Sequence, residues 1–188
     1  MKSIQLPRLH TLALAALLVA LVAPTLDAQT RRGRASVDES PPWAPVSIGA
    51  RFSYDQEVRT QGLGLSLRVP VVRDGTFELN PSVDNLFVRG QDDRQYNVDL
   101  TYVPGGPRGG LILFGGVSWR ESIFALLATE RTRYFGYNLG AGGKTVLGRV
   151  ELEVQIKWTF LNDTQLQPNL VSLGLNYPLW GSGIRPPG

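Results

Sequence analysis

The sequence predicts an all-β fold, an eight-stranded antiparallel up-and-down barrel, and two observations carry this prediction. Apolar and polar residues alternate in eight separate segments, and a period of two residues is typical of a strand with one apolar and one polar face. Connections rich in Gly, Pro and Asp separate these segments, as expected for turns between antiparallel strands. The clearest segment is RVELEVQIKWTF, residues 149–160, in which no residue breaks the alternation.

The same alternation assigns each strand in chain order. Pro81 makes the third strand less regular, because proline cannot donate to a sheet ladder, and Ile112 and Phe114 blur the phase of the fifth strand. Connections are predicted to be short after the even-numbered strands and longer after the third, fifth and seventh, as in transmembrane β-barrels. The predicted strands are residues 46–55, 63–71, 77–87, 96–102, 111–120, 135–144, 149–160 and 171–179, and the predicted longer connections are 89–94, 121–133 and 162–168.

Composition excludes several functional classes. The chain has 188 residues and a formal charge of +3, from 19 Lys and Arg against 16 Asp and Glu, which is too mild to favour nucleic acid as a partner. It has no cysteine, so neither a disulfide nor a Cys-ligated metal site is possible. Its single histidine, His10, lies in a predicted leader. We therefore expect no metal site and no cofactor.

The N-terminal residues have the three parts of a secretory signal: basic residues, an apolar run and Ala28 as a cleavage point. The apolar run is shorter than the roughly 20 residues of a typical spanning helix, so we expect cleavage before Gln29. Leu26 is larger than the residue usually found three places before a cut, and an uncleaved anchor is the alternative. The predicted organisation is a signal peptide at 1–28, a flexible periplasmic linker at 29–45, the barrel at 46–180 and a C-terminal tail at 181–188.

The polar face has the composition of a narrow lumen. Eight glycines lie on it, and glycine weakens a strand unless another group passes close by. The charges assigned to this face cancel, six against six, which suits buried ion pairs because an unpaired charge in a narrow interior is unfavourable. The predicted lumen network is Arg51, Arg68, Arg120, Lys144, Arg149 and Lys157 with Asp55, Glu78, Asp84, Asp99, Glu151 and Glu153.

Aromatic residues of the apolar face lie near the ends of the predicted strands, with Leu, Val, Ile and Ala between them. Two aromatic belts around an aliphatic band are typical of a barrel in a bilayer, where the rings lie at headgroup depth. A soluble core would instead place bulky rings in its middle. The predicted aromatic girdle is Phe52, Tyr54, Trp119, Tyr137, Trp158 and Phe160 toward one rim and Tyr102 and Tyr177 toward the other.

Across residues 46–180 the chain resembles small outer-membrane β-barrels of the OmpA and OmpX kind. In the last strand, Ser172, Gly174, Tyr177 and Leu179 match the pattern that the barrel-assembly machinery recognises in that family. The chain departs from the family after Trp180, because eight further residues follow where such proteins usually end on an aromatic residue. The resemblance implies a bacterial outer-membrane location, outer-membrane lipid and lipopolysaccharide as neighbours, and the assembly machinery as a partner during biogenesis.

Catalytic interpretations are weaker than structural ones. Glu151 and Glu153 are neighbours on one face and fit a general acid and base, but pairing with arginines and lysines of the lumen is the favoured interpretation. Serines of the polar face lack a histidine base in the mature chain, which excludes Ser-His catalysis but leaves a lysine-based variant with Lys144 or Lys157 open. We therefore predict no catalytic residues.

The function predicted from these residues is that of a monomeric, non-enzymatic outer-membrane barrel with a structural or surface-interaction role. Eight strands enclose a space that side chains fill, so a freely conducting pore is not expected. A secreted soluble barrel of the lipocalin type, binding an apolar ligand, is the first alternative, because it would alternate in the same way. A histidine-free lipid-modifying enzyme of the outer membrane is the second.

Overall fold

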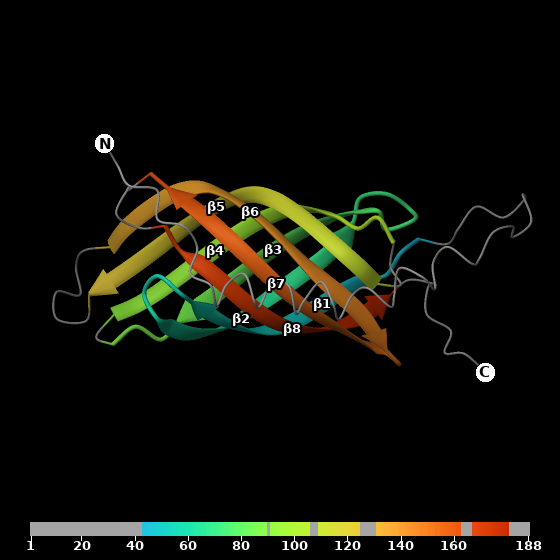
Figure 1. Ribbon diagram of the computed structural model, residues 1–188, viewed down its shortest axis with the longest axis horizontal. Helices are drawn as coiled ribbons and strands as arrows, with labels where there is room; N and C mark the ends of the chain where they lie inside the picture. The colour runs from blue at the N-terminus through green and yellow to red at the C-terminus, as the bar shows by residue number, and fades with distance from the viewer. Residues whose placement is uncertain (1–42, 90, 106–108, 125–130, 163–166, 181–188) are drawn as a thin grey trace, which may run out of the picture.

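The chain folds into one closed antiparallel sheet (Figure 1). Each strand pairs with the next one along the chain, and the last strand, β8, pairs with β1 to close the barrel. The computed structural model describes residues 43–89, 91–105, 109–124, 131–162 and 167–180. Within them, no helix has the length and apolar character needed to span a membrane. The predicted fold class, an all-β eight-stranded up-and-down barrel, is confirmed.

The strands are β1 Val46–Asp55, β2 Thr60–Pro70, β3 Phe77–Leu86, β4 Gln91–Tyr102, β5 Gly109–Phe124, β6 Arg131–Leu147, β7 Val150–Leu161 and β8 Asn169–Trp180. Val46 pairs with Trp180, so both ends of the barrel lie at one rim, which we call the terminal rim. The opposite rim, which we call the loop rim, carries the connections that follow β1, β3, β5 and β7. The predicted signal peptide and C-terminal tail, and most of the predicted linker, lie outside the described residues.

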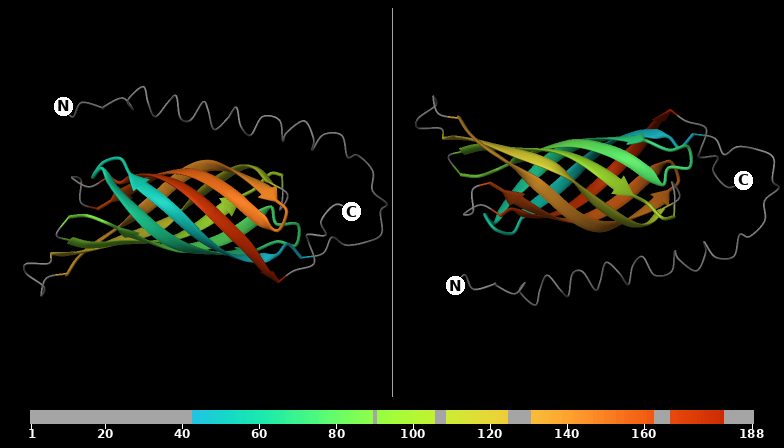
Figure 2. Two further views of the ribbon diagram at one scale, coloured as in Figure 1. Left: turned by 90° about the horizontal axis from the view of Figure 1, so that it is seen from below. Right: turned by 90° about the horizontal axis from the view of Figure 1, so that it is seen from above.

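Several strands extend further toward the loop rim than the sequence predicts, and the extension is longest in β4, β5 and β6. β4 begins at Gln91, and most of the predicted connection 121–133 belongs to β5 and β6, whose hairpin extends beyond the other strands (Figure 2). The predicted difference in connection length is also wrong here, since β2 and β3 are joined by 71–76 whereas β3 and β4 are joined by the shorter 87–90. Residues 91–95 at the start of β4 are all polar, and the extensions of β5 (Glu-Ser-Ile-Phe) and β6 (Arg-Thr-Arg-Tyr) do not alternate regularly, so the signal used for prediction is absent from them.

Two turns at the terminal rim are defined by local chemistry. β6 and β7 are joined by Gly148 and Arg149 alone, and Gly148 has φ of 65°, a conformation that glycine adopts without steric cost. In the turn between β2 and β3, Asp74 Oδ1 accepts a hydrogen bond from the Thr76 amide at 3.0 Å. That hydrogen bond holds the pKa of the Asp74 carboxyl below its usual value.

The described end of the predicted linker packs against this second turn. The Ala44 amide donates to the Arg73 carbonyl at 2.9 Å, and the Arg73 guanidinium lies 5.7 Å from the centre of the Trp43 ring. Ala44 is buried, whereas Trp43 is half exposed. Hence residues immediately before β1 are fixed to the terminal rim by a backbone hydrogen bond and a cation–π contact.

Proline interrupts one ladder without shifting its register. Between β2 and β3 the pairing skips Leu67 and Arg68, which lie opposite Pro81 and Asn80, and resumes at Val69 in the same register. Pro81 has no N–H to donate, which removes a ladder hydrogen bond at this point. The sheet therefore keeps its alternation of faces through β3, although two cross-strand pairs are missing.

The two faces of the sheet meet different surroundings. Outward side chains are apolar and exposed, for example Leu65 at 58%, Leu139 at 55% and Leu175 at 55% relative exposure. Inward side chains are polar and buried: among the described residues, 25 polar or charged side chains are buried against 8 apolar ones. The barrel is therefore polar inside and apolar outside, the reverse of a soluble globular domain.

Candidate functional site in the barrel lumen

The charged side chains inside the barrel form three clusters along its axis. The loop-side cluster contains one base and two acids, the central cluster two of each, and the terminal-side cluster two bases and three acids. All eight strands line the lumen, and ion pairs join strands that are distant in sequence. The members are Arg120, Asp55 and Asp93 in the loop-side cluster, Arg51, Asp84, Lys157 and Asp99 in the central cluster, and Arg68, Lys144, Glu78, Glu151 and Glu153 in the terminal-side cluster.

Arg120 is the centre of the loop-side cluster. Its Nε donates to both oxygens of Asp93, at 2.9 and 3.0 Å, and its Nη1 donates to Asp55 Oδ2 at 2.9 Å. The other Asp55 oxygen accepts from the amides of Glu57 and Val58, in the turn after β1. One arginine thus links β1, β4 and β5, and both aspartates are held by two or more donors.

The central cluster crosses the middle of the barrel. Arg51 forms an ion pair with Asp84, whose Oδ1 also accepts from Ser53 at 3.0 Å. Lys157 Nζ lies 2.6 Å from Asp99 Oδ2 and 5.3 Å from the centre of the Phe114 ring. Each base in this cluster therefore has one carboxylate partner, and Lys157 also has an aromatic face beside it.

The terminal-side cluster is a network rather than a set of pairs. Arg68 contacts Glu151 and Glu153, and its Nη1 lies 3.7 Å from Glu78 Oε2, beyond hydrogen-bond distance. Lys144 Nζ lies 3.0 Å from Glu78 and 3.3 Å from Glu151. The two bases therefore share three carboxylates.

Neutral amides complete this network. Asn176 Nδ2 donates to Glu151 at 3.3 Å and to Glu153 at 2.9 Å, and Gln155 also donates to Glu153. The carboxylates of Glu151 and Glu153 are thus each contacted by at least one cation and one amide. The predicted interpretation of this pair as ion-pair partners fits their contacts, whereas neither is left free to act as a general base.

The predicted lumen network needs two corrections. Arg149 is not in the lumen, because it lies in the two-residue turn between β6 and β7 and is exposed. Alternation predicts a side chain's direction only within a strand, and the strand here begins one residue later. Asp93 was missed, because residues 89–94 were predicted to be a loop, yet Asp93 is 3% exposed and bound to Arg120.

These corrections also change the charge balance. Within the described residues, the clusters contain five bases and seven acids, not the predicted six of each. The loop-side and terminal-side clusters each carry one excess carboxylate. The prediction that the lumen charges cancel is therefore wrong, and neutral donors take part in stabilising the excess.

Two apolar residues of β5 also point into the lumen. Ile112 and Phe114 are 0% and 5% exposed, whereas Leu111 and Leu113 face outward. A Cβ on Gly140 would lie 2.2 Å from the Phe114 ring, so glycine is needed there for the ring to fit against β6. The signal for this packing was present in the sequence as the broken phase of the fifth strand, together with a glycine in the strand that pairs with it.

The aromatic residues of the outward face meet as registered pairs. Tyr96 stacks on Trp119 with ring centres 5.2 Å apart, and Tyr137 stacks on Phe160 at 5.0 Å, both toward the loop rim. Toward the terminal rim, Tyr102 lies 5.1 Å from Phe77. Of the predicted girdle, Phe52, Tyr54, Tyr102, Tyr137, Trp158 and Tyr177 are exposed, and Trp119 and Phe160 are half-buried in these stacks.

The predicted assembly residues divide between the two faces of β8. Ser172 and Gly174 point into the lumen and are buried, whereas Tyr177 and Leu179 are exposed on the outward face. Ser172 Oγ lies 3.1 Å from Ser53 Oγ across the closing seam between β8 and β1. Their role in assembly stays a prediction.

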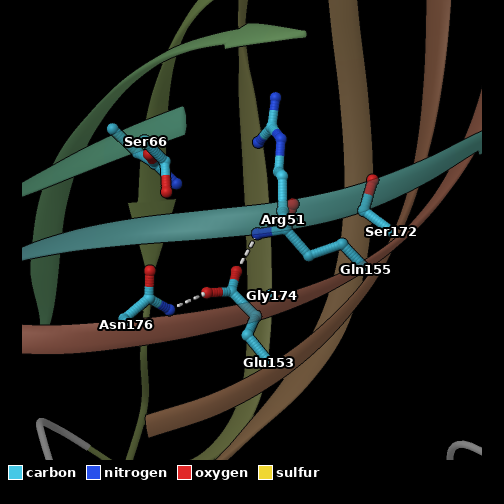
Figure 3. Close-up of a pocket in the computed structure, with 8 residues that line it drawn as sticks. Arg51, Ser66, Glu153, Gln155, Ser172, Gly174 and Asn176 are labelled. Atoms are coloured by element: carbon cyan, nitrogen blue, oxygen red, sulfur yellow. Dashed lines mark hydrogen bonds between the residues drawn. The ribbon is translucent and has the colours of Figure 1, made fainter. Parts of the chain in front are cut away.

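A small cavity lies beside the terminal-side cluster (Figure 3). It measures about 10 Å³, enough for the centre of one water-sized particle. Its lining is polar and comes from β1, β2, β3, β7 and β8. The lining residues are Arg51, Ser66, Asn80, Glu153, Gln155, Ser172, Gly174 and Asn176. No group of three or more acidic or histidine side chains suited to a metal ion occurs within the part of the chain that the structure describes.

Solved structures share this fold. The N-terminal β-barrel domain of OprF from Pseudomonas aeruginosa has a TM-score of 0.59 at 14% identity, over 72% of this chain and 98% of that domain. Ail, the attachment invasion locus protein of Yersinia pestis, solved in complex with the heparin analogue sucrose octasulfate, has a TM-score of 0.51 at 16% identity, over 73% and 99%. No protein-family model and no curated protein matches the chain. The chain therefore has the fold of small eight-stranded outer-membrane barrels, and the predicted resemblance is confirmed at the level of fold.

Proposed function

We propose that this protein is an integral β-barrel of a bacterial outer membrane with a structural or surface-interaction role and no enzymatic activity. The observation that carries the proposal is the outward face, where an exposed band of leucines lies between registered aromatic pairs at the two rims. Such a surface is stable against hydrocarbon and unstable against water. The protein acts as a monomer, because this apolar band encircles the barrel and meets lipid on every side.

The inside of the barrel supports the same proposal. A soluble barrel that binds an apolar ligand would need an apolar interior, with residues such as Leu152 and Val154 shielded at its centre. Here these side chains are on the outward face, whereas Glu153, on the same strand, is 6% exposed in the lumen. The lumen clusters hold the strands together from within, and a barrel of eight strands has an interior that side chains fill, so continuous flow of solute is not expected.

The proposed orientation places the terminal rim in the periplasm and the loop rim outside the cell. One step beyond the Tyr96 and Trp119 stack, Arg94, Glu121 and Arg133 form a registered row on the outward face of β4, β5 and β6. Arg94 and Arg133 are exposed and keep guanidinium donors beyond their single ion pairs. Such donors at headgroup depth suit the phosphates of lipopolysaccharide and other outer-membrane lipids.

A charge placed on the outward face tests directly whether that face contacts hydrocarbon or water. Leu65 lies at the middle of β2 with 58% exposure, so Leu65→Arg should lower the free energy of unfolding in phospholipid vesicles by about 2–4 kcal/mol if that face meets hydrocarbon. On a water-exposed surface the same change would stay within about 0.5 kcal/mol. The matched control is Val58→Arg in the turn after β1, which should be neutral in both media.

Cell fractionation and gel migration should indicate the same membrane location as the unfolding experiment. The chain is expected in the outer-membrane fraction and should migrate differently on a detergent gel before and after heating, as a folded barrel does. A chain that stays soluble without detergent and tolerates Leu65→Arg would refute the proposal. Lipid processing that is lost in Lys144 or Lys157 variants which still fold would refute the absence of enzymatic activity.

A further inference from the structure

The terminal-side cluster lacks one positive charge. Arg68 and Lys144 face Glu78, Glu151 and Glu153, and the cluster's remaining contacts come from neutral amides. An excess carboxylate in an interior is unfavourable unless a cation or a proton joins it. One additional positive charge would therefore stabilise the terminal-side cluster.

Two side chains that line the adjacent cavity bring oxygen atoms close together. Because the Asn176 amide nitrogen donates to Glu151 and Glu153, its oxygen points the other way (Figure 3). A Cβ on Gly49 would lie 1.9 Å from Asn176 Oδ1 and 2.8 Å from Ser66 Oγ, so these two oxygens converge over the bare backbone of Gly49. Glycine at this position is what allows the oxygens to approach each other.

An unpartnered acceptor completes the lining. Asn80 is 3% exposed and lines the cavity, and its Oδ1 has no hydrogen-bond partner among the residues that the structure describes. It lies at the interruption of the ladder between β2 and β3, opposite Arg68. A buried amide oxygen without a donor is unfavourable, so a cation that is coordinated by its lone pairs would be bound favourably.

The one base that lines the cavity turns its charge away from it. Arg51 directs its guanidinium to Asp84 and Ser82 in the central cluster, and its Cβ is the side-chain atom that lies nearest Gly174 (Figure 3). Acceptor oxygens of Asn80, Asn176 and Glu153 therefore lie in the cavity lining together with the aliphatic part of Arg51, whereas its guanidinium does not.

We propose that this cavity binds a small monovalent cation of the size of Na⁺, with Asn80, Ser66, Asn176 and Glu153 as oxygen ligands. Hard cations take carbonyl, hydroxyl and carboxylate oxygens as ligands. One carboxylate among neutral oxygens, one excess negative charge nearby and room for a single water-sized particle favour a monovalent ion over a divalent one. The inference concerns the lumen alone and does not depend on the proposed role at the cell surface.

The test uses the folded full-length chain in detergent micelles at constant chloride, with Na⁺ replaced stepwise by N-methyl-D-glucamine. Na⁺ should broaden the ²³Na resonance saturably and raise the midpoint of thermal unfolding, because a ligand that binds only the folded state stabilises it. Asn80→Leu should abolish both effects. Asn80→Asp, which adds a charged ligand, should tighten Na⁺ binding roughly tenfold, the factor given by about 1.4 kcal/mol.

Asn138 provides the matched control. Asn138 is also a buried asparagine with an unpartnered Oδ1, but it lies away from the cavity. Asn138→Leu should keep the full response to Na⁺. The proposal is overturned if wild type shows no saturable response, if Asn80→Asp leaves the affinity unchanged, or if Asn138→Leu removes the response as well. The proposal would also be overturned if the midpoint of thermal unfolding changed with pH at fixed ionic strength but did not change with Na⁺ concentration. That result would show that a proton neutralises the cluster.

Discussion

The loop-side and terminal-side clusters are both built from buried ion pairs, but the hydrogen bonding of the loop-side cluster is more complete. Arg120 is 1% exposed and directs all its bonds to Asp55 and Asp93, which are themselves satisfied by amides and by Ser122. Arg68 is also buried, yet its Nε has no partner within the described part of the chain, and two of its carboxylates, Glu78 and Glu151, are shared with Lys144. One cluster is a closed hydrogen-bonded unit, and the other is an open network beside a cavity.

This difference separates a structural task from a binding task. A buried ion pair stabilises a fold mainly by the penalty for breaking it, since removal of one partner leaves a desolvated charge. A closed cluster therefore fixes the positions of the strands it joins. An open cluster has spare acceptors and neighbouring bases, so it tolerates loss of one member and can take up a ligand.

The largest expected effect comes from opening the closed cluster. Arg120→Met leaves Asp55 and Asp93 buried at the loop rim without a cation, and we expect a loss of about 3–5 kcal/mol in the free energy of unfolding. Equilibrium unfolding in guanidinium chloride with phospholipid vesicles measures this loss. Arg120→Met with Asp93→Asn returns the cluster charge to the wild-type value of −1 and should recover a large part of it. No recovery in this double variant would show that packing, not charge, explains the loss.

A smaller effect is expected in the open cluster. Arg68→Met removes three carboxylate contacts, but Lys144 remains beside Glu78 and Glu151, and Asn176 remains beside Glu153. We expect a loss of about 1–3 kcal/mol, clearly below that of Arg120→Met in the same unfolding experiment. Equal losses would mean that the two clusters are energetically alike despite their different geometry.

The parts of the lumen that the sequence predicted are those inside regular strands. Arg51, Asp84, Glu153 and Lys157 lie in segments where apolar neighbours mark the outward face, so the inward direction followed from alternation. Which acid meets which base did not follow, because partners such as Arg68 and Glu153 are 85 positions apart in the chain and meet only when the barrel closes.

The failures lie where the regular alternation of apolar and polar residues ends. Asp93 and the ends of β5 and β6 lie in segments without a regular alternation of apolar and polar residues, and Arg149 lies in a turn, where alternation stops. Phe114 departs from the alternation for a different reason. Its apolar ring points into the lumen, and it fits there because Gly140 on the neighbouring strand has no side chain. Such compensation between neighbouring strands cannot be predicted from the sequence of one strand alone.

The smallest expected effects compare single hydroxyls in the two clusters. Ser122 Oγ donates to Asp93 Oδ1 at 3.1 Å, so Ser122→Ala should cost about 1 kcal/mol in the loop-side cluster. Thr101, which pairs with Glu78 across β3 and β4, is fully buried with an unpartnered Oγ1, so Thr101→Val replaces an unsatisfied hydroxyl by a methyl group and should be neutral or stabilising. Unfolding in the same vesicles resolves the sign of each change. A loss for Thr101→Val equal to that for Ser122→Ala would mean that Thr101 is satisfied by water in the lumen, and that the terminal-side cluster is less open than its side-chain contacts indicate.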